Sequence, residues 1–158
     1  MASNIDNNFD LEPDILSEIK EIKFGIVVSK WNKKITDNLF NGAYKTLIKY
    51  GVKEDNIKKI EVPGSFELVY GCKIMLRNDV NAVIAIGCII KGETDHYDYI
   101  CSSVSSGITQ LNIINDIPIV FCVLTDHNID QSINRSGGKH GNKGIESAVA
   151  AIKMASIK

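Results

Sequence analysis

The sequence predicts an α/β domain, a three-layer α/β/α sandwich around a four-stranded parallel sheet. Four short runs of apolar or alternating residues are typical of strands, and they fall at residues 24–28, 57–62, 81–90 and 117–124. Segments with apolar residues at helical spacing separate these runs. Such alternation predicts βαβ units, whose right-handed crossovers place helices on both faces of the sheet. The 158 residues suit one domain.

The first half of the chain contains two strand–helix units. Residues 24–28 (FGIVV) form a β-branched run typical of a strand buried on both faces. Residues 35–50 carry apolar residues at helical spacing, and Gly51 is placed to end that helix. Residues 57–62 alternate apolar and charged side chains before a Pro-Gly pair, which favours a strand. Residues 66–77 are then expected to form the second helix.

The second half repeats the rhythm. Residues 81–90 (NAVIAIGCII) are the strongest buried-strand pattern in the chain. Residues 97–114 suit a helix, residues 117–124 suit another buried strand, and residues 145–157 close the chain as an alanine-rich helix. Residues 1–13, rich in Asn and Asp, are expected to be a flexible arm, so residues 14–158 make up the single domain.

Charge and composition exclude several functions. Eighteen basic and 19 acidic residues give a net charge of −1, which provides no electrostatic reason to expect nucleic acid or an anionic membrane as partner. No apolar run approaches the ~20 residues that span a bilayer. The four cysteines have no CxxC spacing and are expected to be free thiols in a reducing, cytoplasmic compartment. The three histidines have no ligand spacing, so no metal site is expected.

Ligands of parallel sheets bind beyond the carboxyl ends of the strands. Trp31 and Asn32 follow the first predicted strand, where the indole offers a platform for a flat heterocycle or, with about equal weight, a core or interface aromatic. Ser65 and Glu67 follow the second strand. Ser65 can cap the next helix while Glu67, in its first turn, complements the helix dipole; alternatively, Glu67 accepts hydrogen bonds from a polyhydroxy ligand.

The remaining two strand ends carry residues suited to anions. After the third strand, residues 91–96 (KGETDH) open a helix whose backbone N–H groups form a candidate anion site, and His96 is placed for proton transfer. After the fourth, Arg135 suits a bidentate grip on phosphate. The glycine-rich residues 137–144 either cradle phosphate with their lysines or form a flexible turn, and they match neither a Walker A nor a dinucleotide fingerprint.

At these same residues the chain resembles the 6,7-dimethyl-8-ribityllumazine synthase family, over roughly residues 22–156. The match is collinear and consists of several separate motifs. The matching segments are residues 30–32 (KWN) with Ile35, 62–68 (VPGSFEL), 87–100 (GCIIKGETDHYDYI), 117–125 (IPIVFCVLT), Gln131 with Arg135, and 141–144 (GNKG).

The resemblance implies a flavodoxin-like fold and a cofactor-free condensation, the penultimate step of riboflavin biosynthesis. Its substrates would be 5-amino-6-ribitylamino-uracil and 3,4-dihydroxy-2-butanone 4-phosphate. An imine forms, phosphate is eliminated, and the ring closes with loss of water. No Ser or Cys nucleophile is required, because the amine is already nucleophilic.

The resemblance also implies site roles. His96 would shuttle protons and Arg135 would grip phosphate. The implied substrate contacts are Trp31, Asn32, Ser65, Phe66, Glu67, Ile89, Ile90, Lys91, Gly92, Glu93, Thr94, Phe121 and Lys143. Among these, Phe121 would come from a neighbouring subunit. Three departures from the family pattern are Lys30, Asp95 and Asn134, and the last bears on how Arg135 is oriented.

Assembly is implied as well. Members of this family form pentameric rings, and the short turn at residues 137–142 resembles that of members whose rings build a 60-subunit icosahedral shell. The N-terminal arm, near residues 15–19, would add a strand to a neighbouring sheet. Two functional alternatives remain: a riboflavin synthase of the archaeal kind, and a flavin- or lumazine-binding shell protein without catalysis. A nucleotide-binding signalling module is a more distant one.

Overall fold

The computed structural model describes residue 11 and residues 18–157. The predicted arm at residues 1–13 and most of the segment expected to pair with a neighbour therefore lie outside the described part. A short 3-10 turn, η1 (Ile19–Glu21), leads into the first strand, and a second, η2 (Glu54–Asn56), leads into the next.

Four parallel strands form the central sheet, in the order β2-β1-β3-β4. They are β1 (Phe24–Ser29), β2 (Ile57–Val62), β3 (Ala82–Ile90) and β4 (Ile119–Asp126). β1 and β3 are buried along almost their whole length, as strands covered on both faces must be. This confirms the predicted four-stranded parallel sheet.

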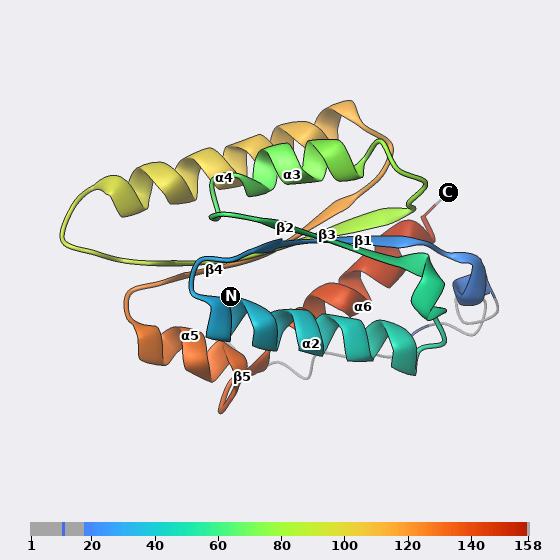
Figure 1. Ribbon diagram of the computed structural model, residues 1–158, viewed down its shortest axis with the longest axis horizontal. Helices are drawn as coiled ribbons and strands as arrows, with labels where there is room; N and C mark the ends of the chain where they lie inside the picture. Colours follow the sequence, from blue (N-terminus) through green and yellow to red (C-terminus); the bar gives the residue numbers. More distant parts are fainter. Residues whose placement is uncertain (1–10, 12–17, 158) are drawn as a thin grey trace.

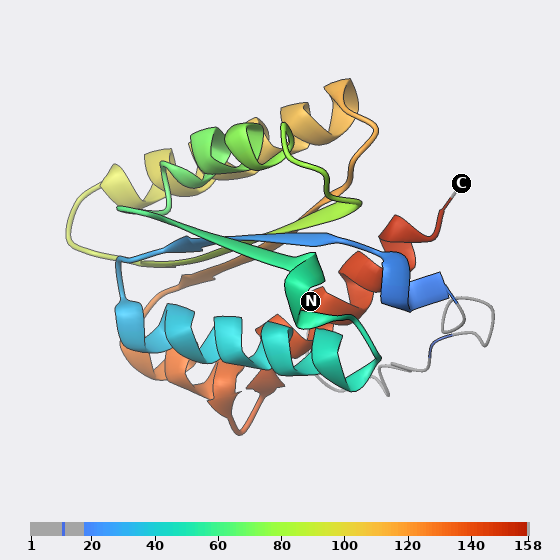
Figure 2. The same cartoon turned by 45° about the vertical axis from the view of Figure 1, so that its right-hand side comes forward.

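Helices cover both faces, which confirms the three-layer sandwich (Figures 1 and 2). The helices are α2 (Lys33–Lys49), α3 (Leu68–Met75), α4 (His96–Ile114), α5 (Ile129–Arg135) and α6 (Lys143–Ala155). Figure 1 shows α3 and α4 above the sheet and the other three below it. The hydrophobic core accordingly divides into two clusters, one between the sheet and helices α2 and α6, and one between the sheet and helices α3 and α4.

Three boundaries differ from the sequence-based expectation. α3 begins at Leu68, so Phe66 and Glu67 lie in the turn before it. β4 starts after Pro118, and it continues to Asp126 because its polar end still pairs with β3. The expected loop after β4 contains the helix α5, which Asn128 caps by accepting a hydrogen bond from the Gln131 N–H at 3.0 Å.

The glycine-rich segment is an ordered hairpin. β5 (Ser136–Gly138) pairs antiparallel with β6 (Gly141–Asn142). Gly137 and Gly141 have φ of +126° and +74°, a conformation that favours glycine. Asn142 then caps α6 by accepting from the Gly144 N–H at 2.8 Å. The segment between α5 and α6 is therefore a hairpin turn with paired strands.

Candidate active site

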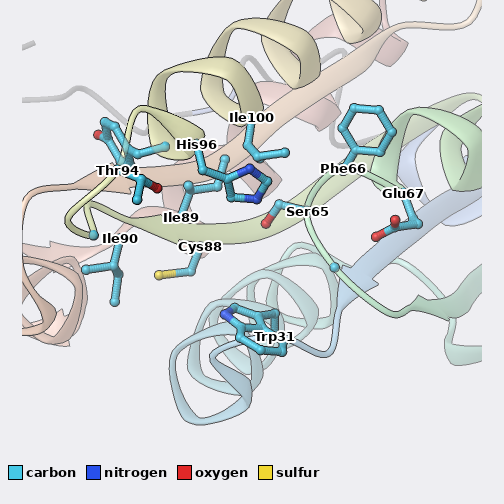
Figure 3. A pocket seen from close by; sticks show the side chains of 13 residues that line it. Trp31, Ser65, Phe66, Glu67, Cys88, Ile89, Ile90, Thr94, His96 and Ile100 are labelled. Atoms are coloured by element: carbon cyan, nitrogen blue, oxygen red, sulfur yellow. The ribbon is translucent and has the colours of Figure 1, made fainter.

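A pocket of about 650 Å³ opens at the carboxyl ends of β1, β2 and β3. This is the edge at which a parallel sheet binds ligands. We call it the strand-end pocket, and Figure 3 shows its side chains. Its lining residues are Trp31, Gly64, Ser65, Phe66, Glu67, Cys88, Ile89, Ile90, Gly92, Thr94, His96, Tyr97 and Ile100.

Two large aromatic rings border this pocket. The Trp31 side chain follows β1 and is 70% exposed, while Phe66 precedes α3 and is 55% exposed. In the view of Figure 3 they lie on either side of Ser65. Within one chain, Trp31 is therefore not a core aromatic, and two exposed rings at a concave site suit a flat, partly apolar ligand.

Asn32 fixes the turn that presents Trp31. Its backbone is left-handed, with φ 55° and ψ 46°, a conformation that costs most L residues about 1–2 kcal/mol and that asparagine tolerates better than most. Its side-chain Nδ2 donates to the backbone oxygen of Cys88 at 3.0 Å, which ties the β1 turn to β3. The amide of Asn32 is thus directed at the protein backbone in this structure.

Ser65 carries a buried hydroxyl with no hydrogen-bond partner in the described part of the chain. The residue is only 7% exposed. It does not cap α3 with its side chain: Glu67 is the residue that precedes the helix, and the Leu68 N–H donates to the Ser65 backbone oxygen at 3.2 Å. Figure 3 shows the hydroxyl pointing into the same cavity as the His96 imidazole. Buried hydroxyls are nearly always paired, so this one is a candidate partner for a polar atom of a ligand or of an ordered water.

Gly87 makes room for that hydroxyl. A Cβ at Gly87 would lie 2.8 Å from both Ser65 Oγ and the Leu68 side chain. Glu67 stands ahead of α3 without a side-chain capping bond, and its carboxylate folds back over Gly64. The predicted capping role of Ser65 is therefore not observed, whereas Glu67 directly precedes α3, where its carboxylate lies near the positive end of the helix.

The loop between β3 and α4 forms the third wall. Lys91 N–H donates to the Asp126 backbone oxygen at 2.9 Å, which ties the start of this loop to β4. Gly92, Thr94 and His96 line the pocket, whereas Lys91 and Glu93 do not. α4 begins at His96, and within the described residues nothing hydrogen-bonds to the exposed imidazole. The geometry leaves that ring available for proton transfer.

Phe121, Arg135 and Lys143 lie elsewhere. They line a second hollow of about 650 Å³ on β4, α5 and α6, together with Asp126 and Glu146. We call it the cationic depression. Lys143 is paired with Glu146 at 2.7 Å. One chain thus divides the sequence-predicted residues between two surfaces, and α5 lies on the opposite side of the sheet from α4 (Figure 1).

The thiols near these sites are neutral. Burial is the main cause that raises the pKa of Cys88, and the hydrogen bond with Ser132 lowers it by less. Burial likewise raises the pKa of the Tyr97 hydroxyl. Neither group is therefore prepared as an anionic nucleophile. All four cysteines are free.

Two searches of residue 11 and residues 18–157 give negative results. No group of three or more His, Cys, Asp and Glu side chains there is arranged to hold a metal ion. None of the described helices combines the length and apolarity that crossing a bilayer demands.

Comparison with known proteins identifies the family. The family model described as 6,7-dimethyl-8-ribityllumazine synthase matches residues 21–158. The chain is 51% identical to the protein of that name from Christiangramia forsetii, over all of this chain and 95% of the relative. It is 53% identical to that from Flavobacterium johnsoniae, over all of this chain and 84% of the relative. It is also 53% identical to that from Bacteroides fragilis, over 84% of this chain and 94% of the relative. The chain belongs to the 6,7-dimethyl-8-ribityllumazine synthase family.

Proposed function

We propose that the strand-end pocket is where this chain carries out the reaction of its family. The chain is a transferase that condenses 5-amino-6-ribitylamino-uracil with 3,4-dihydroxy-2-butanone 4-phosphate. The products are 6,7-dimethyl-8-ribityllumazine, phosphate and water, in the penultimate step of riboflavin biosynthesis. The observation that carries the assignment to this pocket is the unpaired, buried Ser65 hydroxyl between two exposed aromatic rings.

The pyrimidine is proposed to bind in the strand-end pocket. Trp31 stacks on the ring, Phe66 closes the other side, and the Ser65 hydroxyl hydrogen-bonds a polar ring atom. The backbone of Ile89 and Ile90 borders the ring, and Glu67, at the pocket mouth, accepts hydrogen bonds from the ribityl chain. Asn32 supports this site from behind by holding the turn that carries Trp31.

The phosphate is proposed to bind at the loop before α4. The N-terminus of this 19-residue helix and the backbone N–H groups of Gly92, Glu93 and Thr94 favour an anion there, with Lys91 adding positive charge nearby. His96, at the first helical position, lines the same pocket and would lie between the proposed pyrimidine and phosphate positions. It can take the proton released as the imine forms and return protons as phosphate and water depart.

Alignment of the two substrates supplies much of the expected acceleration. The substrate amine is a competent nucleophile, so attack on the ketone needs proximity more than activation. The imine then eliminates phosphate, and the second nitrogen closes the ring with loss of water. We therefore expect His96→Ala to retain measurable activity, with a loss below the ~10²–10⁴-fold typical of an essential general acid–base.

Self-association is proposed to complete the site. Phe121, Arg135 and Lys143 lie on the cationic depression of one chain, away from its own strand-end pocket. A second copy can bring that depression against the pocket, so that Arg135 meets the phosphate. Exposed apolar side chains at Tyr99 and Ile113 provide further contact surface. We extend the proposal to pentameric rings and a 60-subunit shell, and the free thiols suit a cytoplasmic location.

A direct assay tests this function. Purified protein is mixed with both substrates, and lumazine formation is followed by absorbance, with controls that omit each substrate or the protein. Formation well above the uncatalysed rate supports the proposal, and no acceleration by folded protein contradicts it.

Arg135→Ala is expected to raise the KM for the phosphate substrate; unchanged saturation would remove Arg135 from that role. Sedimentation velocity measures the assembly, and pentamers alone would contradict the shell.

A further inference from the structure

Asp126 is a buried residue, and one of its two carboxylate oxygens accepts a hydrogen bond from a buried serine hydroxyl. The residue ends β4 and is 6% exposed. Ser132 Oγ donates to Asp126 Oδ2 at 2.7 Å, and the Cys88 thiol lies 3.4 Å from the same Ser132 oxygen. Because Ser132 is fully buried, this contact fixes the direction of the carboxylate.

The other carboxylate oxygen of Asp126, Oδ1, faces Arg135. Oδ1 lies 3.8 Å from Arg135 Nη1, and that nitrogen also donates to the Gln131 backbone oxygen at 3.2 Å. A carboxylate this deeply buried needs a counter-charge, and in the described part of the chain Arg135 is the cation within ion-pair distance. Both contacts that the described residues make with the guanidinium use Nη1, which leaves Nε and Nη2 for a bidentate contact with an anion.

The other cation of the depression is already committed. Lys143 Nζ contacts both carboxylate oxygens of Glu146, at 2.8 and 2.7 Å. The Arg135 side chain is 36% exposed, and its distance from Asp126 is longer. Of the two cations, Arg135 is thus the one that lies within ion-pair distance of a buried carboxylate and still keeps donors for an incoming anion. The residue before it, Asn134, is uncharged and supplies no carboxylate to orient it.

We propose that Asp126 is a positioning residue that holds Arg135, through Nη1, in the orientation in which the other guanidinium nitrogens grip a phosphoryl group. Asp126 touches no substrate itself, and Ser132 acts only by orienting Asp126. The identity of the anion as the phosphate of the butanone substrate rests on the proposed function. The orientation of Arg135 toward phosphate as a chemical class does not.

Asp126→Asn tests the inference, because the amide oxygen still accepts the Ser132 hydrogen bond while the charge is lost. Asp126→Thr is a second, smaller replacement in case the amide disturbs folding. Asp37→Asn is the matched control, since it removes a carboxylate from the exposed Lys33–Asp37 pair on α2. Each variant is assayed for both KM values, for kcat, for inhibition by inorganic phosphate, and for thermal unfolding.

The expected result for Asp126→Asn is a selective loss of phosphate recognition. We expect the KM for the phosphate substrate and the inhibition constant of inorganic phosphate to rise about tenfold, because a guanidinium that is free to reorient gives up part of its bidentate contact and loses more conformational entropy on binding. The KM for the pyrimidine substrate and kcat should change less than about twofold, and Asp37→Asn should match the wild type.

Two results would overturn the inference. Tighter or unchanged phosphate binding in Asp126→Asn would show that the carboxylate merely offsets the charge of Arg135. Equal changes in both KM values, following a drop in unfolding temperature, would show a structural role only. If the wild-type chain formed no lumazine, the proposed function would fail by itself, and titration calorimetry with inorganic phosphate would still decide the role of Asp126.

Discussion

Replacing Ser65 by alanine should change stability and activity in opposite directions. The Ser65 hydroxyl is buried, aimed into the strand-end pocket, and has no hydrogen-bond partner among the described residues. Folding therefore removes this group from bulk water without a hydrogen bond from the described part of the chain to replace it. Alanine keeps the Cβ and removes only the oxygen, so it relieves that cost while deleting a contact for the substrate.

The size of each effect follows from the burial of the hydroxyl. A buried polar group without a partner costs about 1–3 kcal/mol, so Ser65→Ala should raise the free energy of unfolding by about 1 kcal/mol. For a chain of this size that corresponds to a rise of about 2–4 °C in Tm. A hydrogen bond to the substrate contributes ~0.5–1.5 kcal/mol, so kcat/KM should fall about two- to tenfold.

Calorimetry and steady-state kinetics on the same preparations measure both quantities. Ser136→Ala is the matched control, because that serine is also buried but donates to the Ile133 backbone oxygen at 3.3 Å. Its loss should destabilise the fold by about 1 kcal/mol. A Ser65→Ala protein that unfolds at a lower temperature and keeps its full kcat/KM would refute the reasoning.

Three further predictions concern backbone fit and pH. Gly144→Ala should cost about 3 kcal/mol in urea unfolding, because its Cβ would lie 1.9 Å from the Leu39 carbonyl oxygen, whereas Gly92→Ala, with nothing within 4 Å, should change stability by less than about 0.5 kcal/mol. Asn32→Ala should be about 1 kcal/mol less stable than Asn32→Gly, since only glycine accepts φ 55° without strain; equal stabilities would contradict this. Burial raises the pKa of Cys72 from 9.0 to about 12, so the unfolded thiol ionises first. Stability should then fall by up to about 1.4 kcal/mol per pH unit between pH 9 and 12, a slope that Cys72→Ala should reduce.

Hydrophobic periodicity was enough to predict the sheet and four of its helices, α2, α3, α4 and α6. The run at residues 81–90 is buried on both faces, so its apolar character is continuous, and β3 occupies Ala82–Ile90. The same method ended the fourth strand at Leu124, because Thr125 and Asp126 are polar. Their backbone still pairs with β3, and polarity at the end of a strand reflects a site rather than a turn.

The helix α5 was not predicted from the sequence, for a different reason. It has seven residues, too few to display a clear apolar face, and only Ser132 is buried in it. The evidence in the sequence was its cap: Asn128 precedes Gln131 by three residues, and its side chain accepts the Gln131 N–H. A search for cap residues would have found this helix and separated it from the hairpin that follows.

The strand-end rule located the pocket but not the division of the predicted site. Position after a strand says that a side chain lies at one edge of the sheet, yet it does not say how far the following segment carries it from that strand end. Trp31, Ser65 and His96 come together in one pocket. Arg135 also follows β4, but it is the last residue of α5, and the hollow that it lines lies on α6 and the edge strand β4.

This division has a physical logic in the proposed reaction. Arg135 is 36% exposed in one chain, where solvent weakens its attraction for an anion. Contact with a second copy would exclude water from the guanidinium as the phosphate binds. The electrostatic attraction between the guanidinium and the phosphate would then be stronger. The buried Asp126 has a complementary effect, because it orients the Arg135 guanidinium before association. A guanidinium that is already oriented loses less conformational entropy when it binds phosphate. Association and preorganisation thus act on the same side chain, one by removing solvent and the other by fixing direction.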